Sequence, residues 1–244
     1  MMTDNPAERL LKILENGKKI GIEKPNKLAW MQVLEVPGDN LNSHSILLSK
    51  LGKVMLLPHD ILNLVSLHYP AQISGYQYSF NQIQAAFLNQ NLNENWHTFI
   101  RHIDSHSLNT LSMISALLDQ KLETTTIENE KLNLFREKLK KLINETLKSN
   151  LSTEFKKFMT HYLNKILNAI NDYLISGAMP VMDAIEATLG HAVLNESFKD
   201  ELKNTDTGKS ISQMLADLAN TVAIATAATG TIAYFSTHGF PLLT

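Results

Sequence analysis

Apolar residues recur every three or four positions along most of the chain, which is the spacing of one face of an α-helix. The clearest example lies near the N-terminus. There Asn5 can cap a helix, Pro6 suits its first turn, and Glu8 occupies the position from which a capping-box carboxylate reaches back. Gly17 fits the C-terminal cap. The apolar stripe of this predicted helix consists of Leu10, Leu11, Ile13 and Leu14.

Further short helices are predicted in the N-terminal third. One is expected over 25–36, and two more are expected to flank Pro58, since proline usually ends or kinks a helix. His59 and Asp60 then read as the start of the second of these, where an acidic side chain complements the helix dipole. Additional helices are predicted over 79–88, 94–104 and 107–122.

Two stretches later in the chain carry heptad-like apolar seams. The first seam consists of Leu132, Phe135, Leu139 and Leu142, and the second of Leu151, Phe155, Phe158 and Tyr162. A Ser/Asn-rich corner at 148–150 separates them, so the pattern predicts an antiparallel helical hairpin, with one continuous helix as the alternative. The charged positions of 128–141 carry both signs; they suit a solvated helix face, or alternatively a binding surface for an acidic partner.

Glycine and proline are absent between Gly75 and Gly177. Strand-rich folds need turn residues about every 8–12 positions, so this gap favours long helices. The predicted fold is all-α: a multi-helix bundle with a long central hairpin and an apolar C-terminal helix. The predicted organisation is a block of short helices over 1–75, a long-helix bundle over 76–210, and the apolar helix over 211–244.

The C-terminal segment from Leu218 to Thr244 has no Asp, Glu, Lys or Arg. Small residues recur in it at a spacing that lets two helices pack closely, and one aromatic residue follows them. The small residues are Ala219, Ala223, Ala227 and Gly230, and the aromatic residue is Phe235. The stretch 218–235 approaches the minimum length of a membrane span, but its alanine and threonine content makes insertion marginal. Three interpretations of this segment therefore remain: a buried packing helix, a membrane-associated helix or an oligomerisation helix. A polar linker is expected before the segment, over 203–210.

Composition narrows the function classes. Hydrophobic residues make up 44% of the chain and the net charge is -2, which suits a globular protein and argues against a general nucleic-acid binder. The absence of cysteine excludes disulfides, thiolate metal sites and cysteine catalysis. The N-terminus lacks a secretory signal pattern, so we expect synthesis in the cytoplasm, with membrane association or signal-less export as later fates.

Functional side chains are densest over 95–106. His102 and His106 would share a face of a continuous helix and are weak candidates for metal ligands, since a site needs a third ligand. Arg101, four intervening residues and His106 form an R-x4-H element. It resembles the motif of the HEPN-family ribonucleases, which are all-helical and metal-independent. That resemblance implies that Arg101 stabilises phosphate charge and His106 transfers a proton, usually in a cleft between two protomers.

No complete catalytic signature is present, and Gly208-Lys209-Ser210 lacks the upstream glycine of a phosphate-binding loop. We therefore expect a non-enzymatic helical interaction protein without a cofactor, effector- or toxin-like, acting at a membrane through its C-terminal helix. The partner is expected to be a protein, and homo-oligomerisation is open. The alternative is a HEPN-like ribonuclease using Arg101 and His106, in which case RNA is the substrate.

Overall fold

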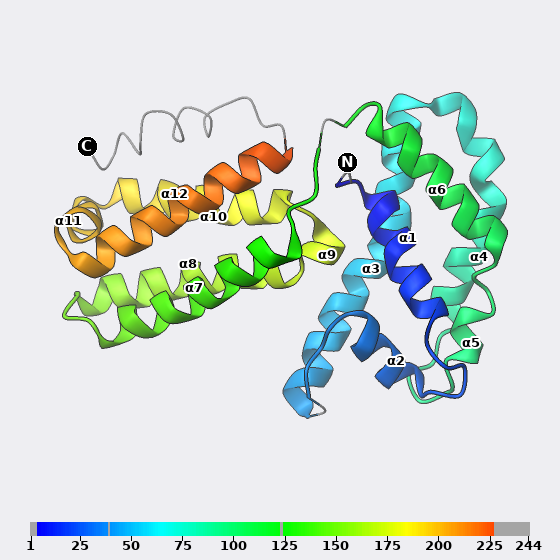
Figure 1. Ribbon diagram of the computed structural model, residues 1–244, viewed down its shortest axis with the longest axis horizontal. Coiled ribbons are helices and arrows are strands. Elements are labelled where there is room, and N and C mark those ends of the chain that lie inside the picture. The colour runs from blue at the N-terminus through cyan, green and yellow to red at the C-terminus, as the bar shows by residue number, and fades with distance from the viewer. Residues whose placement is uncertain (1–3, 39, 123, 227–244) are drawn as a thin grey trace. The chain divides into compact units, whose positions relative to one another are not determined.

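The computed structural model describes residues 4–38, 40–122 and 124–226. Its described residues form helices and no strand, which confirms the all-α prediction (Figure 1). The chain divides into two compact units: Asn5–Glu123, here the N-terminal unit, and Met1–Asp4 with Thr124–Thr244, here the C-terminal unit. The sequence pattern predicts boundaries after residues 75 and 210, whereas the units divide between residues 123 and 124.

The N-terminal unit is built from six α-helices and a short 3-10 turn among its described residues. They are α1 (Pro6–Lys18), α2 (Asn26–Val33), α3 (Leu41–His68), η1 (Pro70–Gln72), α4 (Ile73–Asn89), α5 (His97–Ile100) and α6 (Ser105–Asp119). α1 packs against α3 and α6, and α4 packs against α3, α5 and α6. α4, α5 and α6 thus lie in the same compact unit as α1, α2 and α3.

α3 differs from the prediction, because it continues through Pro58 as one helix of 28 residues. Proline at this position removes one backbone hydrogen bond and costs about 3 kcal/mol in a helix interior. Leu57, Ile61 and Val65 are nearly fully buried on the same helix, and each such side chain stabilises by about 1.5–3 kcal/mol. Their burial outweighs the defect, so Asp60 lies in mid-helix rather than at a helix start.

The helix over 6–18 forms as predicted at its start and differs at its end. Asn5 Oδ1 accepts the Glu8 N–H at 2.9 Å, so Asn5 is the N-cap. The helix runs past Gly17 to Lys18, and Gly17 lies against the buried ring of Trp96. The Trp96 indole N–H donates to the Gly17 carbonyl at 2.8 Å. Gly17 therefore serves close packing rather than capping.

The C-terminal unit contains the remaining described helices. They are α7 (Asn129–Lys148), α8 (Thr153–Asn171), α9 (Tyr173–Ser176), α10 (Met179–Leu194), α11 (Glu196–Asn204) and α12 (Asp206–Thr226). α7 and α8 form the predicted hairpin, α10 packs on α8, and α12 packs on both α7 and α10 (Figure 1). The four long helices enclose one hydrophobic core.

The buried face of α8 is only partly the predicted one. Phe155 is fully buried, but Phe158 and Tyr162 are half-buried at the edge of the core. The residues that line the core from α8 are Phe155, Met159, Leu163, Ile166 and Ile170. The predicted and the observed stripes lie on adjacent faces of one helix, so the spacing of apolar residues alone does not distinguish them.

The predicted polar linker over 203–210 is instead a tight helical corner. Thr205 alone separates α11 from α12, and its hydroxyl accepts the Gly208 N–H at 2.9 Å. A Cβ at Gly208 would lie 2.1 Å from the Glu201 carbonyl oxygen. Glycine is required here because the two helices approach one another at backbone distance.

Asp4 is grouped with the C-terminal unit, while Asn5 begins the N-terminal unit. The Asp4 carboxylate accepts the Ala178 N–H at 2.9 Å, and the Asp4 carbonyl accepts the Thr124 hydroxyl at 3.0 Å. Ala178 precedes α10 and has no polar side chain with which to cap it. Asp4 thus supplies an acceptor at the start of a helix that is distant in sequence.

Candidate functional site

The structure places the two residues of the R-x4-H element at the neighbouring ends of two different helices, α5 and α6. Arg101 follows the last residue of α5, and His106 lies in the first turn of α6. Within the described residues, no hydrogen bond or ring contact joins their side chains. The His106 ring instead packs edge-on against Tyr78, with ring centroids 5.5 Å apart.

A small polar cluster surrounds His106 at the start of α6. The Asp104 carboxylate caps the helix by accepting the Ser107 N–H at 2.7 Å, and it accepts the Tyr78 hydroxyl at 3.3 Å. Partial burial raises the pKa of Asp104, but hydrogen bonding by Ser107 and Tyr78 and the nearby His106 outweigh it, so the pKa is lowered. The arrangement holds an ionised cap on the helix.

The predicted histidine pair does not share a helix face. His102 lies between α5 and α6, whereas His106 is on α6, because the predicted helix over 94–104 shortens to four residues. Throughout the part of the chain that the structure describes, no group of three or more His, Asp or Glu side chains could hold a metal ion.

The C-terminal packing residues fall partly within the described chain. Ala219 is buried in the core of the C-terminal unit, and Ala223 is half-buried against it. Ala227, Gly230 and Phe235 lie outside the described residues. The described part of the apolar segment, 218–226, is therefore a helix packed on the core of the C-terminal unit, and the role of 218–235 stays a prediction.

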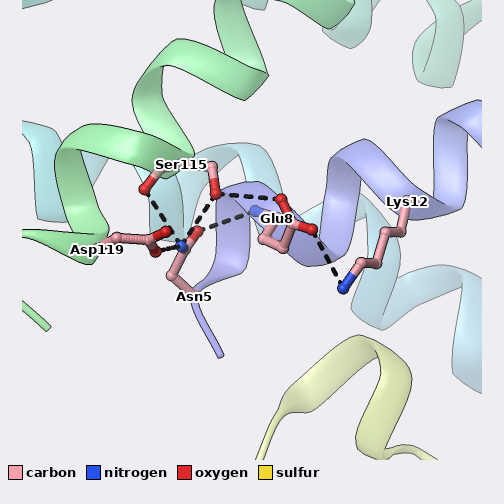
Figure 2. Close-up of polar contacts among 5 residues, drawn as sticks. All are labelled: Asn5, Glu8, Lys12, Ser115 and Asp119. Atoms are coloured by element: carbon pink, nitrogen blue, oxygen red, sulfur yellow. Dashed lines mark hydrogen bonds and ion pairs between the residues drawn. The ribbon is translucent and has the colours of Figure 1, made fainter. Parts of the chain in front are cut away.

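The densest polar network in the N-terminal unit joins α1 to α6 (Figure 2). The Asn5 amide donates to the Ser115 hydroxyl at 3.1 Å and to the Asp119 carboxylate. The Ser115 hydroxyl donates in turn to Glu8 at 3.2 Å, and Glu8 pairs with Lys12 at 3.1 Å. The Glu8 side chain therefore anchors α6 rather than closing a capping box.

The role of that network is structural. Asn5 is fully buried, and both ends of its amide are hydrogen-bonded. Ser115 is also buried, and its hydroxyl both accepts from Asn5 and donates to Glu8. The hydrogen bonds of this network explain how α1 and α6 are held together, and we assign the network no catalytic role.

A different feature is open to solvent: one face of α3. Four large apolar side chains lie on it and remain exposed, namely Leu41 (83%), Leu48 (48%), Met55 (41%) and Leu56 (60%). Leu41, Leu48 and Met55 are seven residues apart, so they share one side of the helix. Gly52 lies between them, and a Cβ there would meet nothing within 4 Å. We call Leu41, Leu48, Gly52, Met55 and Leu56 the α3 apolar face.

The α3 apolar face was missed because apolar residues recur on more than one side of this helix, and their spacing does not show which side the core leaves exposed. In the structure the opposite side of the helix carries the core residues. The nearest charged residues, Lys53 and Asp60, lie beside this face rather than on it. An exposed apolar stripe of this kind marks an interaction surface more often than an isolated exposed leucine does.

No helix among residues 4–38, 40–122 and 124–226 combines the length and apolarity of a membrane span. Comparison with protein-family models, curated proteins and solved structures gives no match for this chain.

Proposed function

We propose that this is a non-enzymatic helical interaction protein that binds an amphipathic helix of a partner protein through the α3 apolar face. The observation that supports it is the exposure of Leu41, Leu48 and Met55 at heptad spacing on an uncharged face. Heptad-spaced apolar side chains are the pattern by which one helix packs against another.

The geometry of the face suits this role. Leu48 and Met55 lie one helical turn to either side of Gly52, whose missing side chain leaves room for a partner backbone or a large apolar side chain. Methionine adapts its shape to different partners. Docking would remove these side chains from water without disturbing the buried side of α3.

The experiment places a photo-crosslinking amino acid at Leu48, identifies the captured protein, and then measures binding of the two purified proteins. Leu48→Lys and Met55→Lys should each weaken that binding by about tenfold or more, since a charge is then desolvated in an apolar contact. Leu134→Lys, at an exposed α7 leucine, is the matched control. If neither α3 substitution weakens binding to any partner identified by crosslinking, the proposal is wrong.

The membrane role of 218–235 stays a prediction, together with the effector- or toxin-like setting. Leu218, Ala219, Val222 and Ala225 are buried in the C-terminal unit, so insertion of this part would require α12 to leave the core. Flotation of the full chain with vesicles, compared with a chain truncated after Thr226, tests the role without removing α12. Equal flotation of both would exclude a contribution from 227–244.

The ribonuclease alternative also stays a prediction. RNA cleavage by the purified protein should vanish in Arg101→Ala and in His106→Ala while the helical circular-dichroism signal is retained. Arg136→Ala is a control for the loss of an arginine elsewhere. Absence of cleavage by the unsubstituted protein would end this alternative.

A further inference from the structure

An open groove runs along the surface of the C-terminal unit between α7 and α12, with a volume of about 510 Å³. The two helices are antiparallel, because the Thr125 N–H, just before α7, donates to the Ala225 carbonyl near the end of α12. The residues lining the groove from α7 are Lys138, Lys141, Leu142 and Glu145. Those from α12 are Lys209, Ser210, Gln213, Met214 and Asp217.

Three lysines from two helices converge on this groove. Lys138 and Lys209 are exposed, and neither forms an ion pair within the described residues. Lys141 lies 3.6 Å from Glu145, one turn further along α7. The three lysines outnumber the two carboxylates that line the groove, Glu145 and Asp217, so the groove carries one net positive charge although the whole chain is slightly acidic.

The two carboxylates of the groove each have a partner on their own helix. Glu145 pairs with Lys141, and the Asp217 carboxylate accepts the Gln213 amide at 2.8 Å. They lie toward opposite ends of the groove because α7 and α12 run antiparallel. The charge pattern therefore favours a ligand with separate carboxylates over one with densely packed negative charge.

The groove also has an apolar floor. Leu142 and Met214 line it from α7 and α12, although both are largely buried in the core beneath. The α7 stretch from Lys138 to Glu145 extends for about 10 Å, or two turns. An apolar floor with a cationic rim is the complement of a short amphipathic segment with acidic flanks.

We propose that the groove between α7 and α12 binds a short acidic, amphipathic segment of a partner protein. Carboxylates of the segment pair with Lys138 and Lys209, and an apolar side chain rests on Leu142 and Met214. The site is independent of the α3 apolar face, which lies in the other unit. The chain's own residues 227–244 contain no Asp or Glu and do not match the lysines.

The test is fluorescence anisotropy of a labelled amphipathic peptide in which glutamates flank a leucine stripe, titrated with the full chain. Lys138→Glu combined with Lys209→Glu should weaken binding by about tenfold or more, because attraction becomes repulsion. Glu145→Gln combined with Asp217→Asn should strengthen it by about threefold. Lys140→Glu is the matched control, since Lys140 is exposed on α7, pairs with Glu137 and does not line the groove.

Opposite responses of the two double variants, with an unchanged control, support the proposal. Equal binding by all variants, or no binding by the unsubstituted chain, overturns it. Two competitors and one truncation test for the other possible occupants of the groove. Displacement of the peptide by inorganic phosphate assigns the groove to a simple anion, and displacement by phosphatidylserine vesicles assigns it to a lipid surface. Tighter binding after truncation at Thr226 assigns it to the chain's own end. Each of these also overturns the proposal.

Discussion

A Cβ atom at Gly208 would lie 2.1 Å from the carbonyl oxygen of Glu201, and 2.7 Å from the Leu202 Cα. Both neighbours are backbone atoms of α11, so no side chain can rotate away. We expect Gly208→Ala to destabilise the C-terminal unit by about 3 kcal/mol, at the upper end of overpacking effects. Thermal unfolding monitored by circular dichroism measures this loss.

The matched control is Gly190→Ala in α10 of the same unit. Its added Cβ meets nothing within 4 Å. Alanine forms helices better than glycine, so stability should rise by about 0.5–1 kcal/mol. Similar effects at both positions would show that the close approach at Gly208 does not constrain the corner.

The amide of Asn5 is the centre of the contact between α1 and α6. Asn5→Asp keeps the oxygen that caps the Glu8 N–H, but it replaces a donor with a second carboxylate beside Asp119. We expect a loss of about 1–3 kcal/mol in urea unfolding at neutral pH. Adding Asp119→Asn should recover most of it, because one carboxylate and one amide are again present. A loss that Asp119→Asn leaves unchanged would contradict this pairing.

The fold was predictable where local chemistry decided the outcome. The Asn5 cap and the buried seam of Leu132, Phe135 and Leu139 follow from side-chain type and spacing alone. Two features were not predictable locally. Pro58 stays within a helix because tertiary burial of its neighbours outweighs a defect that short-range rules treat as decisive. Gly208 looked like a loop residue, since only the packed position of α11 reveals why a side chain is excluded.

Gly17 makes a similar but softer contact with the aromatic core of the N-terminal unit. A Cβ there would lie 3.0 Å from Trp96 Cζ2 and 3.4 Å from Ile100 Cδ1. Gly17→Ala should cost about 1–2 kcal/mol, because the indole must shift while its N–H remains bound to the Gly17 carbonyl. Gly21→Ala, which meets nothing within 4 Å, is the control. Tryptophan fluorescence during urea unfolding reports both.

Ionisation of Asp104 should make the start of α6 sensitive to acid. Its pKa is lowered in the folded chain, so its carboxylate stabilises the fold above the ordinary carboxyl pKa of about 3.9. That stabilisation is lost as the pH falls through the lowered pKa. Asp104→Asn keeps a capping oxygen without a charge, so its deficit relative to the unsubstituted protein should be greatest near neutral pH and shrink toward pH 3. A deficit independent of pH would contradict the prediction.

The candidate sites were less predictable than the fold. Arg101 and His106 satisfied a spacing rule, but the chain leaves helical geometry between them, so spacing alone did not define their relative positions. The α3 apolar face was not predictable, because the spacing of apolar residues does not show which side of a helix the core leaves exposed. Lys138 and Lys209 are far apart in sequence, and only the antiparallel packing of α7 and α12 brings them to one groove.

The division of the chain between Asp4 and Asn5 has a consequence for synthesis on the ribosome. Asp4 is made early, but its partner Ala178 emerges only after the whole N-terminal unit has been translated. The N-terminal unit can therefore fold while the chain is still growing. The C-terminal unit folds later, and it then takes up Asp4, which is translated before the N-terminal unit. Vectorial folding would thus order the two units in time, with the acceptor for the start of α10 already present when that helix appears.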